Sequence, residues 1–245
     1  AALDLGINLF DTAEMYGNGY SEEVLGKALK ASGYSREKYM IATKVCESYL
    51  SKELLRQHLQ KSLDRLSVDY IDIYQIHWHS RAAVKTATYP ERPLDAEIPL
   101  EETMTELSKL QSEGKIKYIA VCNFGPQDIQ EILRIGVPII SNQLPYSLLW
   151  RNIENSSSSS SSSDDNSVEP SSITKLCEQN GIGIMAWGCL MQGLLCDGKY
   201  QTADDVPPGR ARNRLFSNQR SQQRHGEPGL EKETFSTMED IRKIV

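Results

Sequence analysis

The sequence predicts an α/β fold in which short buried strands alternate with amphipathic helices. Three of its features support this: the spacing of the apolar runs, their continuity, and the helical patterns between them. The predicted strands are Ile7–Thr12, Tyr39–Val45, Ile71–Trp78, Ile116–Asn123, Ile139–Gln143 and Gly183–Trp187. The first three start about 32 residues apart, which is the length of one strand–helix unit. Most of the runs are continuously apolar, a pattern typical of strands covered on both faces in a parallel sheet.

The stretches between these strands carry apolar side chains at helical spacing. One stripe consists of Leu55, Leu59, Leu63 and Leu66, and another of Leu100, Met104, Leu107 and Leu110. We expect Ser21 and Ser51 to be N-cap residues, because a serine oxygen can accept hydrogen bonds from free backbone N–H groups. Glu22, Glu23, Glu101 and Glu102 would then place negative charge in the first helical turns, as the helix dipole favours. Further helices are predicted over Ser172–Asn180 and Glu231–Val245, the latter with Phe235, Met238, Ile241 and Ile244 as its apolar stripe.

Alternating strands and helices leave two architectures, a doubly wound sheet or a closed barrel. A doubly wound dinucleotide-binding domain carries G-x-G-x-x-G after its first strand, and that motif is absent here. We therefore predict a (β/α)₈ TIM barrel over residues 1–245 as a single domain. About six of its eight strands can be recognised, and the opening AALDLGINLF resembles a helix end capped by Gly6 before a strand. We expect the barrel to be truncated at both ends.

The segment 155–170 interrupts this pattern. It contains eight consecutive serines followed by DDNSVEP, a composition too polar to bury an apolar core. We interpret it as a disordered, low-complexity loop insertion.

The overall composition excludes several functional classes. A net charge of −6 without a Lys/Arg-rich stripe argues against a nucleic-acid partner. No apolar run approaches the roughly 20 residues that span a bilayer, so no membrane partner is expected. The five cysteines are scattered without a C-x-x-C pair, which favours a reducing compartment and a cytoplasmic location. Because the amino terminus looks incomplete, targeting to an organelle stays open.

Four polar residues lie at or just beyond the carboxyl ends of three successive predicted strands. They are Asp11, Tyr16, Lys44 and His77. In a barrel these strand ends meet at one rim, where the active site is assembled. Each residue by itself has a structural explanation, such as a turn cap or a lysine that extends to solvent. Their combination favours a catalytic site.

The residue types indicate how such a site would work. A phenol with a pKa near ~10 is a poor acid at neutral pH. We expect the charge of Lys44 to lower the pKa of Tyr16, and Asp11 to keep Lys44 charged and oriented. His77 could orient a substrate carbonyl while Tyr16 delivers a proton to its oxygen. No side chain supplies a hydride, so a nicotinamide cofactor is implied.

The chain resembles the aldo-keto reductase family over about residues 1–200. FDTAEMYGNGYSEEVLGKAL resembles the family signature FDTAxxYG…SExxLGxAL, ATKV resembles the strand that carries the catalytic lysine, and DYIDIYQIHW the strand that carries the histidine. The resemblance implies that Asp11, Tyr16, Lys44 and His77 are the family's catalytic tetrad, with Tyr16 as the general acid.

The resemblance also implies a cofactor site. VCNF resembles the family's VSNF, so Asn123 should hold the nicotinamide carboxamide, with Cys122 in place of the usual serine; Gln143 in SNQLPYSLLWR should contact the same group. IMAWGCLMQGLLCDGKY resembles the strand whose aromatic residue, here Trp187, stacks on the nicotinamide, and the backbone that follows should cradle the pyrophosphate. The implied cofactor-binding residues are Cys122, Asn123, Gln143, Trp187, Gly188, Leu190, Gln192 and Gly193.

Few residues in the sequence help to choose between NADP(H) and NAD(H). The family's basic loop for the adenosine 2′-phosphate has no equivalent here, and Arg210, Arg212 and Arg214 are better interpreted as a solvated basic loop. The preference for NADP(H) over NAD(H) is therefore implied only by the resemblance to the family. We assign no role to His58, His79 or His225, and without ligand spacing of Cys and His we predict no metal.

The predicted function is NAD(P)H-dependent reduction of an aldehyde or ketone to an alcohol, with a small-molecule carbonyl substrate. Two alternatives remain open: a cofactor-binding regulatory subunit resembling the potassium-channel β subunits, and an inactive truncated homologue. Turnover by the purified chain would favour the enzyme, and an absence of stabilisation by cofactor would favour the inactive homologue.

Overall fold

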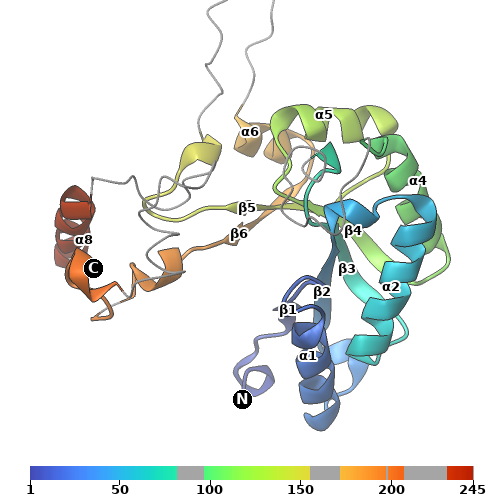
Figure 1. Ribbon diagram of the computed structural model, residues 1–245, viewed down its shortest axis with the longest axis horizontal. Coiled ribbons are helices and arrows are strands. Elements are labelled where there is room, and N and C mark those ends of the chain that lie inside the picture. The colour runs from blue at the N-terminus through green and yellow to red at the C-terminus, as the bar shows by residue number, and fades with distance from the viewer. Residues whose placement is uncertain (82–96, 155–171, 197, 207–230, 245) are drawn as a thin grey trace, which may run out of the picture. The chain divides into compact units, whose positions relative to one another are not determined.

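The structure is a computed structural model that describes residues 1–81, 97–154, 172–196, 198–206 and 231–244 (Figure 1). Its strands are β1 (Leu9–Asp11), β2 (Met40–Val45), β3 (Ile71–Ile76), β4 (Ile116–Cys122), β5 (Ser141–Pro145) and β6 (Gly183–Trp187). They form one six-stranded sheet in chain order, and the pairs from β1 to β5 are parallel. The predicted α/β class and its six strands are confirmed, and the arrangement is that of a partial barrel. The serine-rich segment 155–170 lies outside the described residues.

The helices alternate with these strands. The α-helices are α1 (Tyr20–Ala31), α2 (Lys52–Leu66), α4 (Leu100–Ser112), α5 (Pro126–Ile135), α6 (Ile173–Gln179) and α8 (Glu231–Ile244). Short 3₁₀ helices are η1 (Leu3–Leu5), η2 (Arg36–Lys38), η3 (Glu47–Tyr49), η4 (Asn152–Glu154), η5 (Met191–Gly193) and η6 (Ala203–Asp205). None of the helices in these described ranges is long and apolar enough to cross a membrane.

The chain divides into two compact units. The first unit comprises Ala1–Gln143 and Ile173–Ile184, and the second comprises Leu144–Ser172 and Met185–Val245. The prediction of a single barrel domain stays a prediction. In the second unit, Phe235 and Met238 of α8 pack with Met191, Leu194, Tyr200 and Val206. The predicted stripe of α8 ends early, because Ile244 is 85% exposed.

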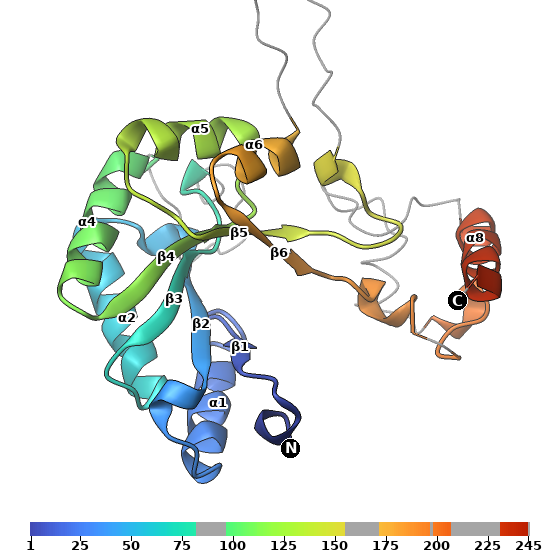
Figure 2. The same cartoon turned by 180° about the vertical axis from the view of Figure 1, so that it is seen from behind.

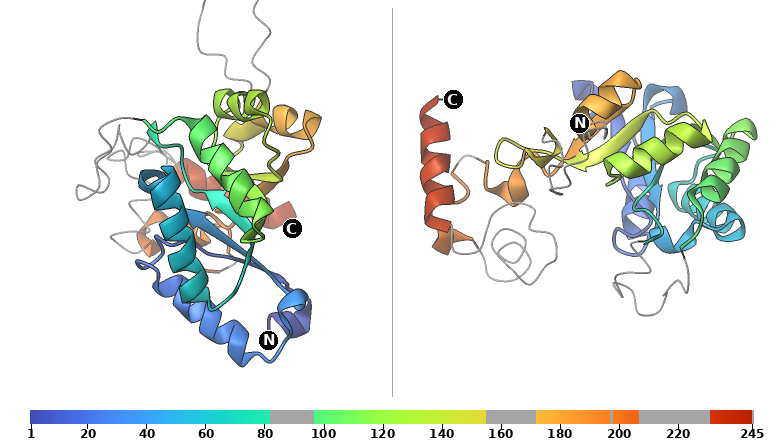
Figure 3. Two further views of the ribbon diagram at one scale, coloured as in Figure 1. Left: turned by 90° about the vertical axis from the view of Figure 1, so that its right-hand side faces the viewer. Right: turned by 90° about the horizontal axis from the view of Figure 1, so that it is seen from above.

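In the first unit the helices cover one face of the sheet (Figure 2). Successive helices pack against one another, α1 on α2, α2 on α4 and α4 on α5 (Figure 3). The two predicted leucine-rich stripes are confirmed: each of their eight side chains is at most 3% exposed. Strand burial differs from the prediction at the edges of the sheet. All of β3 is buried, whereas β1 and β6, each with a neighbour on one side, are partly exposed.

Helix starts were predicted less well. Ser51 is the N-cap of α2, but its side chain makes no capping hydrogen bond. The N-cap of α1 is Gly19 and not Ser21, because the preceding turn requires positive φ, +92° at Gly19, which glycine adopts without strain. The Ser21 hydroxyl instead lies 2.8 Å from the Thr12 hydroxyl. Gly6 does cap the first helical turn, at φ +82°, although that turn is 3₁₀.

The strand register determines which side chains share the face opposite the helices. Leu9, Ala42, Ile73 and Ala120 form a small apolar cluster on that face. Side chains alternate along a strand, so the residues two positions further along β1, β2 and β3 share it: Asp11, Lys44 and Gln75. The polar residues thus lie directly beyond an apolar layer.

We predict that Gly26→Ala destabilises the first unit. A Cβ at Gly26 would lie 2.6 Å from the backbone oxygen of Leu66, where α1 crosses the end of α2. Because the obstacle is backbone, the helices must move apart, at a cost of about 1–3 kcal/mol. Chemical denaturation measures the loss, with Lys27→Ala on the exposed side of α1 as the control. Equal stability of the two variants would contradict the close approach.

Candidate active site

An ion pair between a buried lysine and a partly exposed aspartate lies at the carboxyl ends of β1 and β2. The Lys44 side chain is 1% exposed, and its Nζ donates to Asp11 Oδ2 at 2.7 Å. The same ammonium donates to the backbone oxygen of Thr12, also at 2.7 Å. A buried ammonium needs such partners, since it has lost its hydration. Asp11 and Thr12 therefore fix the charge at one point.

Tyr16 and His77 complete the arrangement. The Tyr16 ring centroid lies 5.1 Å from Lys44 Nζ. The same ring meets the His77 ring edge-on, with centroids 5.8 Å apart and planes at 77°. His77 is placed directly after β3, where its N–H donates to the Val45 oxygen at 2.9 Å. The structure thus brings together the four side chains that the sequence singled out.

The electrostatics of Tyr16 differ from the expectation. Burial raises the pKa of the Tyr16 phenol, the charge of Lys44 lowers it, and the charge of Asp11 raises it. The net direction is upward, so the predicted lowering of this pKa was wrong. Lys44 acts in the predicted sense, but the loss of solvent around the phenol outweighs it.

Gln75 belongs to the same cluster and was missed by the sequence analysis. Its side chain is fully buried, and Nε2 donates to Asp11 Oδ1 at 3.1 Å. The signal that could have identified it is the period of two along a strand: Gln75 precedes His77 by two residues and therefore shares its face.

Glu14 and His58 anchor the turn that carries Tyr16. One oxygen of Glu14 accepts the Cys46 N–H at 2.7 Å, and the other lies 2.6 Å from His58 Nδ1. The His58 ring stacks on Tyr49 with centroids 3.5 Å apart. His58, to which no role was assigned, thus ties α2 to the turn between β1 and α1.

His79 lies after β3, among charged neighbours. It is buried, and that burial, with the charge of Arg81, lowers its pKa. Arg81 pairs with Asp128 at 2.8 Å. Burial and Arg81 thus disfavour the charged form of His79, which we interpret as part of a structural cluster. His225 lies outside the described residues.

The cofactor residues predicted in the first unit adjoin one another. Asn123 adopts a left-handed conformation, with φ +63°. Its Nδ2 donates to the His77 backbone oxygen at 3.1 Å and to Cys122 Sγ at 3.0 Å. Its backbone N–H donates to the Gln143 oxygen at 2.9 Å. Asn123, Cys122 and Gln143 thus occupy adjacent ends of β4 and β5, with Asn123 tied to the segment that holds His77.

The remaining predicted cofactor residues lie at the end of β6 and in the second unit. The Trp187 backbone oxygen accepts the Tyr146 N–H at 3.1 Å. Four residues of the following turn have positive φ: Gly188 (+73°), Met191 (+48°), Gln192 (+59°) and Gly193 (+95°). Leu190 is 59% exposed. A Cβ at Gly193 would lie 2.5 Å from Lys199 Nζ, so this backbone passes directly beside an ammonium that the sequence analysis missed.

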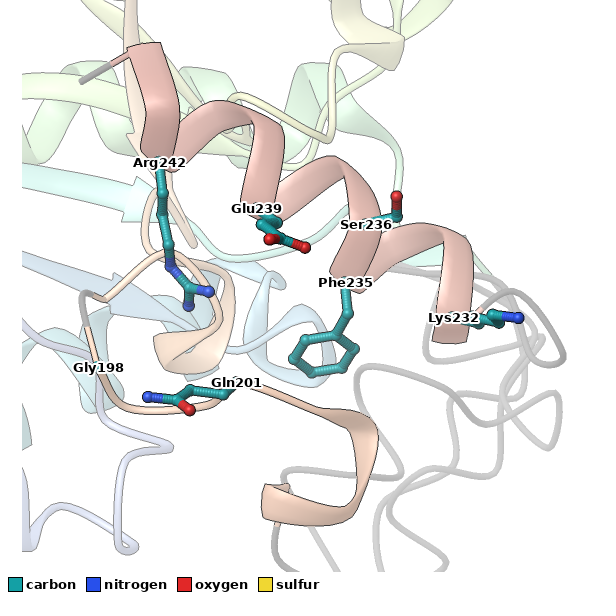
Figure 4. Close-up of a pocket in the computed structure, with 7 residues that line it drawn as sticks. All are labelled: Gly198, Gln201, Lys232, Phe235, Ser236, Glu239 and Arg242. Atoms are coloured by element: carbon teal, nitrogen blue, oxygen red, sulfur yellow. The ribbon is translucent and has the colours of Figure 1, made fainter.

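A pocket in the second unit lies beside α8 (Figure 4). It is lined by Gly198, Gln201, Lys232, Phe235, Ser236, Glu239 and Arg242. It contains none of the residues predicted for catalysis or cofactor binding. Within the described parts of the chain, no group of three or more His, Cys, Asp or Glu is placed to hold a metal ion. Arg210, Arg212 and Arg214 lie outside those parts.

Comparison with known proteins adds independent information. The model of the Aldo/keto reductase family matches residues 1–244. Aldo-keto reductase YhdN of Bacillus subtilis is 34% identical over 203 residues, covering 80% of this chain and 51% of the relative. The NADH-specific methylglyoxal reductase of Escherichia coli is 35% identical over 230 residues, covering 86% and 60%. The chain therefore spans about half to three-fifths of the length of these relatives.

The fold is also that of solved family members. The crystal structure of an aldo-keto reductase from Klebsiella pneumoniae in complex with NADPH superposes with a TM-score of 0.61 at 30% identity, covering 84% of this chain and 61% of that one. The family match along nearly the whole sequence agrees with the strand-end cluster found in the structure. The chain belongs to the aldo/keto reductase family of oxidoreductases.

Proposed function

We propose that this protein catalyses the nicotinamide-dependent reduction of an aldehyde or ketone to an alcohol, with Tyr16 as the general acid. The observation that carries the proposal is the position of the Tyr16 phenol between a buried ammonium and an imidazole, 5.1 Å and 5.8 Å from its ring centroid. Membership of the aldo/keto reductase family supports the reaction class.

Each member of the cluster has a distinct part in this chemistry. A bound nicotinamide would supply the hydride that this reduction needs. Tyr16 gives its proton to the carbonyl oxygen as negative charge develops there, and His77 orients that oxygen. Lys44 stabilises the phenolate left on Tyr16, and Asp11 holds Lys44 in place. The raised pKa of Tyr16 keeps its proton available throughout neutral pH.

Within each of the two units, taken separately, residues have the chemistry that a nicotinamide cofactor needs. Asn123 and Gln143 lie at adjacent strand ends and would bind the carboxamide, beside the thiol of Cys122. Trp187 would offer an aromatic face for the nicotinamide ring. The turn Gly188–Gly193, with Leu190 and Gln192, would hold the pyrophosphate. The passage of the Gly193 backbone beside Lys199 suits an anionic group there.

We propose NADP(H) in preference to NAD(H), with a small carbonyl compound as substrate. The Klebsiella relative was solved with NADPH, which supports this choice. The E. coli relative is described as NADH-specific, so both cofactors occur among similar proteins. Two outcomes would replace this proposal. Cofactor binding without turnover would indicate a regulatory subunit, and a lack of cofactor binding would indicate an inactive homologue.

We predict that Tyr16→Phe abolishes carbonyl reduction. General acid catalysis contributes about 10²–10⁴-fold to such a step, and phenylalanine has no proton to give. Cofactor affinity should change little, because the substitution removes one oxygen atom from a residue that is already 43% exposed. Steady-state reduction of a panel of aldehydes measures the loss, and cofactor fluorescence measures binding. Unchanged turnover in this variant would exclude Tyr16 as the acid.

The pH dependence of reduction should follow the raised pKa of Tyr16. The acid is protonated below its pKa, so kcat/KM should stay level through neutral pH and fall only as the pH rises above the usual tyrosine value of about 10. Lys44→Met should raise this pKa further, because Lys44 is the charge that lowers it. Absorbance of tyrosinate, taken as the difference from a matched Tyr16→Phe background, measures the titration. Titration of Tyr16 at a lower pH in Lys44→Met would contradict the proposed role of the lysine.

Cofactor preference can be measured on the protein itself. A ligand that binds only the folded state adds about 2.7 kcal/mol to the free energy of unfolding at a hundredfold excess over its Kd, and so raises the Tm. We expect NADPH to raise the Tm more than NADH at equal concentration, and Asn123→Ala to reduce both shifts. Thr237→Ala, at an exposed position on α8 in the second unit to which no cofactor role is assigned, is the control. A larger shift with NADH would reverse the proposed preference.

A further inference from the structure

Gln75 occupies an unusual position for a glutamine. It lies in β3, in register with Lys44 on β2 and with Ala120 on β4. Its side chain is fully buried on the face opposite the helices, the face that carries Asp11 and Lys44. Positions of this kind inside a barrel are usually filled by branched apolar residues.

The hydrogen bonding of Gln75 is incomplete. Its Nε2 donates to Asp11 Oδ1 at 3.1 Å. This orientation of the amide follows from chemistry, because an ionised carboxylate only accepts hydrogen bonds. The other amide atom, Oε1, is a buried oxygen that has no hydrogen-bond partner among the described residues. A buried acceptor without a donor costs stability, so packing alone does not explain a glutamine here.

The Gln75 amide restrains the orientation of the Asp11 carboxylate. Lys44 binds Oδ2 of the carboxylate at 2.7 Å and Gln75 binds Oδ1 at 3.1 Å, so both oxygens are engaged and rotation of the group is restrained. The fixed carboxylate, together with the Thr12 oxygen, fixes the ammonium of Lys44. That ammonium in turn faces the Tyr16 ring.

We propose that Gln75 is a positioning residue for carbonyl reduction, whose amide orients Asp11 and, through Asp11, holds the Lys44 ammonium where it supports Tyr16. The inference rests on the proposed function. It adds to the four predicted side chains a fifth, which touches neither substrate nor cofactor.

Gln75→Met tests the role with a side chain of similar length and no amide. We expect kcat to fall about tenfold with a smaller change in KM, as a small misplacement of a catalytic group would cause. Tyr16 in the cofactor-free protein should titrate at higher pH, since a less fixed Lys44 stabilises the phenolate less. The Tm should stay level or rise, because the buried oxygen without a donor is gone.

Ile73→Val is the matched control, since Ile73 lies two residues before Gln75 on the same strand and face. It removes core packing, so it should lower the Tm while leaving kcat and the Tyr16 titration unchanged. The contrast matters because a residue with a purely structural role would behave like the control. A Gln75→Met variant with lowered Tm and unchanged kcat would overturn the inference.

Gln75→Glu tests for rescue by a group that can donate only when protonated. The introduced carboxyl would face Asp11 from β1 and Lys44 from β2; on β4 its register partner is Ala120, with the Cys122 thiol two residues further along. Burial and the negative charge of Asp11 raise the pKa of such a carboxyl, and the positive charge of Lys44 lowers it. Below that pKa it donates to Asp11 as the amide does, so activity should approach that of the unmodified protein. Activity should fall as the pH rises through it.

A pH profile of Gln75→Glu identical to that of the unmodified protein would overturn the inference. Tyr16→Phe in the same assay separates this failure from failure of the proposed function. If Tyr16→Phe abolishes turnover while Gln75→Met and Gln75→Glu leave it intact, only the role of Gln75 is wrong. If Tyr16→Phe retains turnover, the proposed function and the inference both fail.

Discussion

The ion pair of Lys44 and Asp11 is the interaction on which the site depends. An ammonium that is 1% exposed has lost nearly all its hydration, and the fold replaces it with one carboxylate oxygen and one backbone oxygen. Removing Asp11 would deprive the buried ammonium of its carboxylate partner and leave it the hydrogen bond to the Thr12 oxygen, a loss that is unfavourable for a charge without its hydration. The parallel pairing of β1 with β2 is therefore coupled to the chemistry, because it places Asp11 and Thr12 within reach of Lys44. The turn that follows Thr12 then carries Tyr16 across the same charge.

The site balances two opposing effects on one phenol. The burial of Lys44 strengthens its field at Tyr16, since less water screens that charge, but the partial desolvation of the phenol disfavours the phenolate. In the structure the second effect is larger, and Tyr16 keeps its proton. An acid that stays protonated at neutral pH and becomes a good donor only when charge develops on a nearby oxygen suits carbonyl reduction. In the proposed reaction the neighbouring ion pair would act mainly on the transition state.

Much of the fold and site followed from the sequence because both depend on patterns along the chain. Continuous apolar runs predicted the six strands, and polar residues at their ends predicted the convergence of Asp11, Lys44 and His77. What the sequence did not show depends on three-dimensional neighbours. Gln75 lies within a buried strand, and only the strand register reveals that it faces Asp11. The turn before α1 needs a positive φ at Gly19, so α1 has its N-cap there and not at Ser21 as predicted. The direction in which the pKa of Tyr16 shifts depends on local burial, which cannot be deduced from the sequence.

The central claim is that Lys44 and Asp11 act as one unit on Tyr16, and a double-mutant cycle on kcat/KM tests it most directly. Asp11→Asn, Lys44→Met and the double variant would be compared with the unmodified protein in aldehyde reduction, with folding of each verified by its Tm. Groups that act together show strongly non-additive losses. The account predicts that the double variant is no slower than the slower single variant. Losses that simply multiply would show that the two residues act independently, and would contradict it.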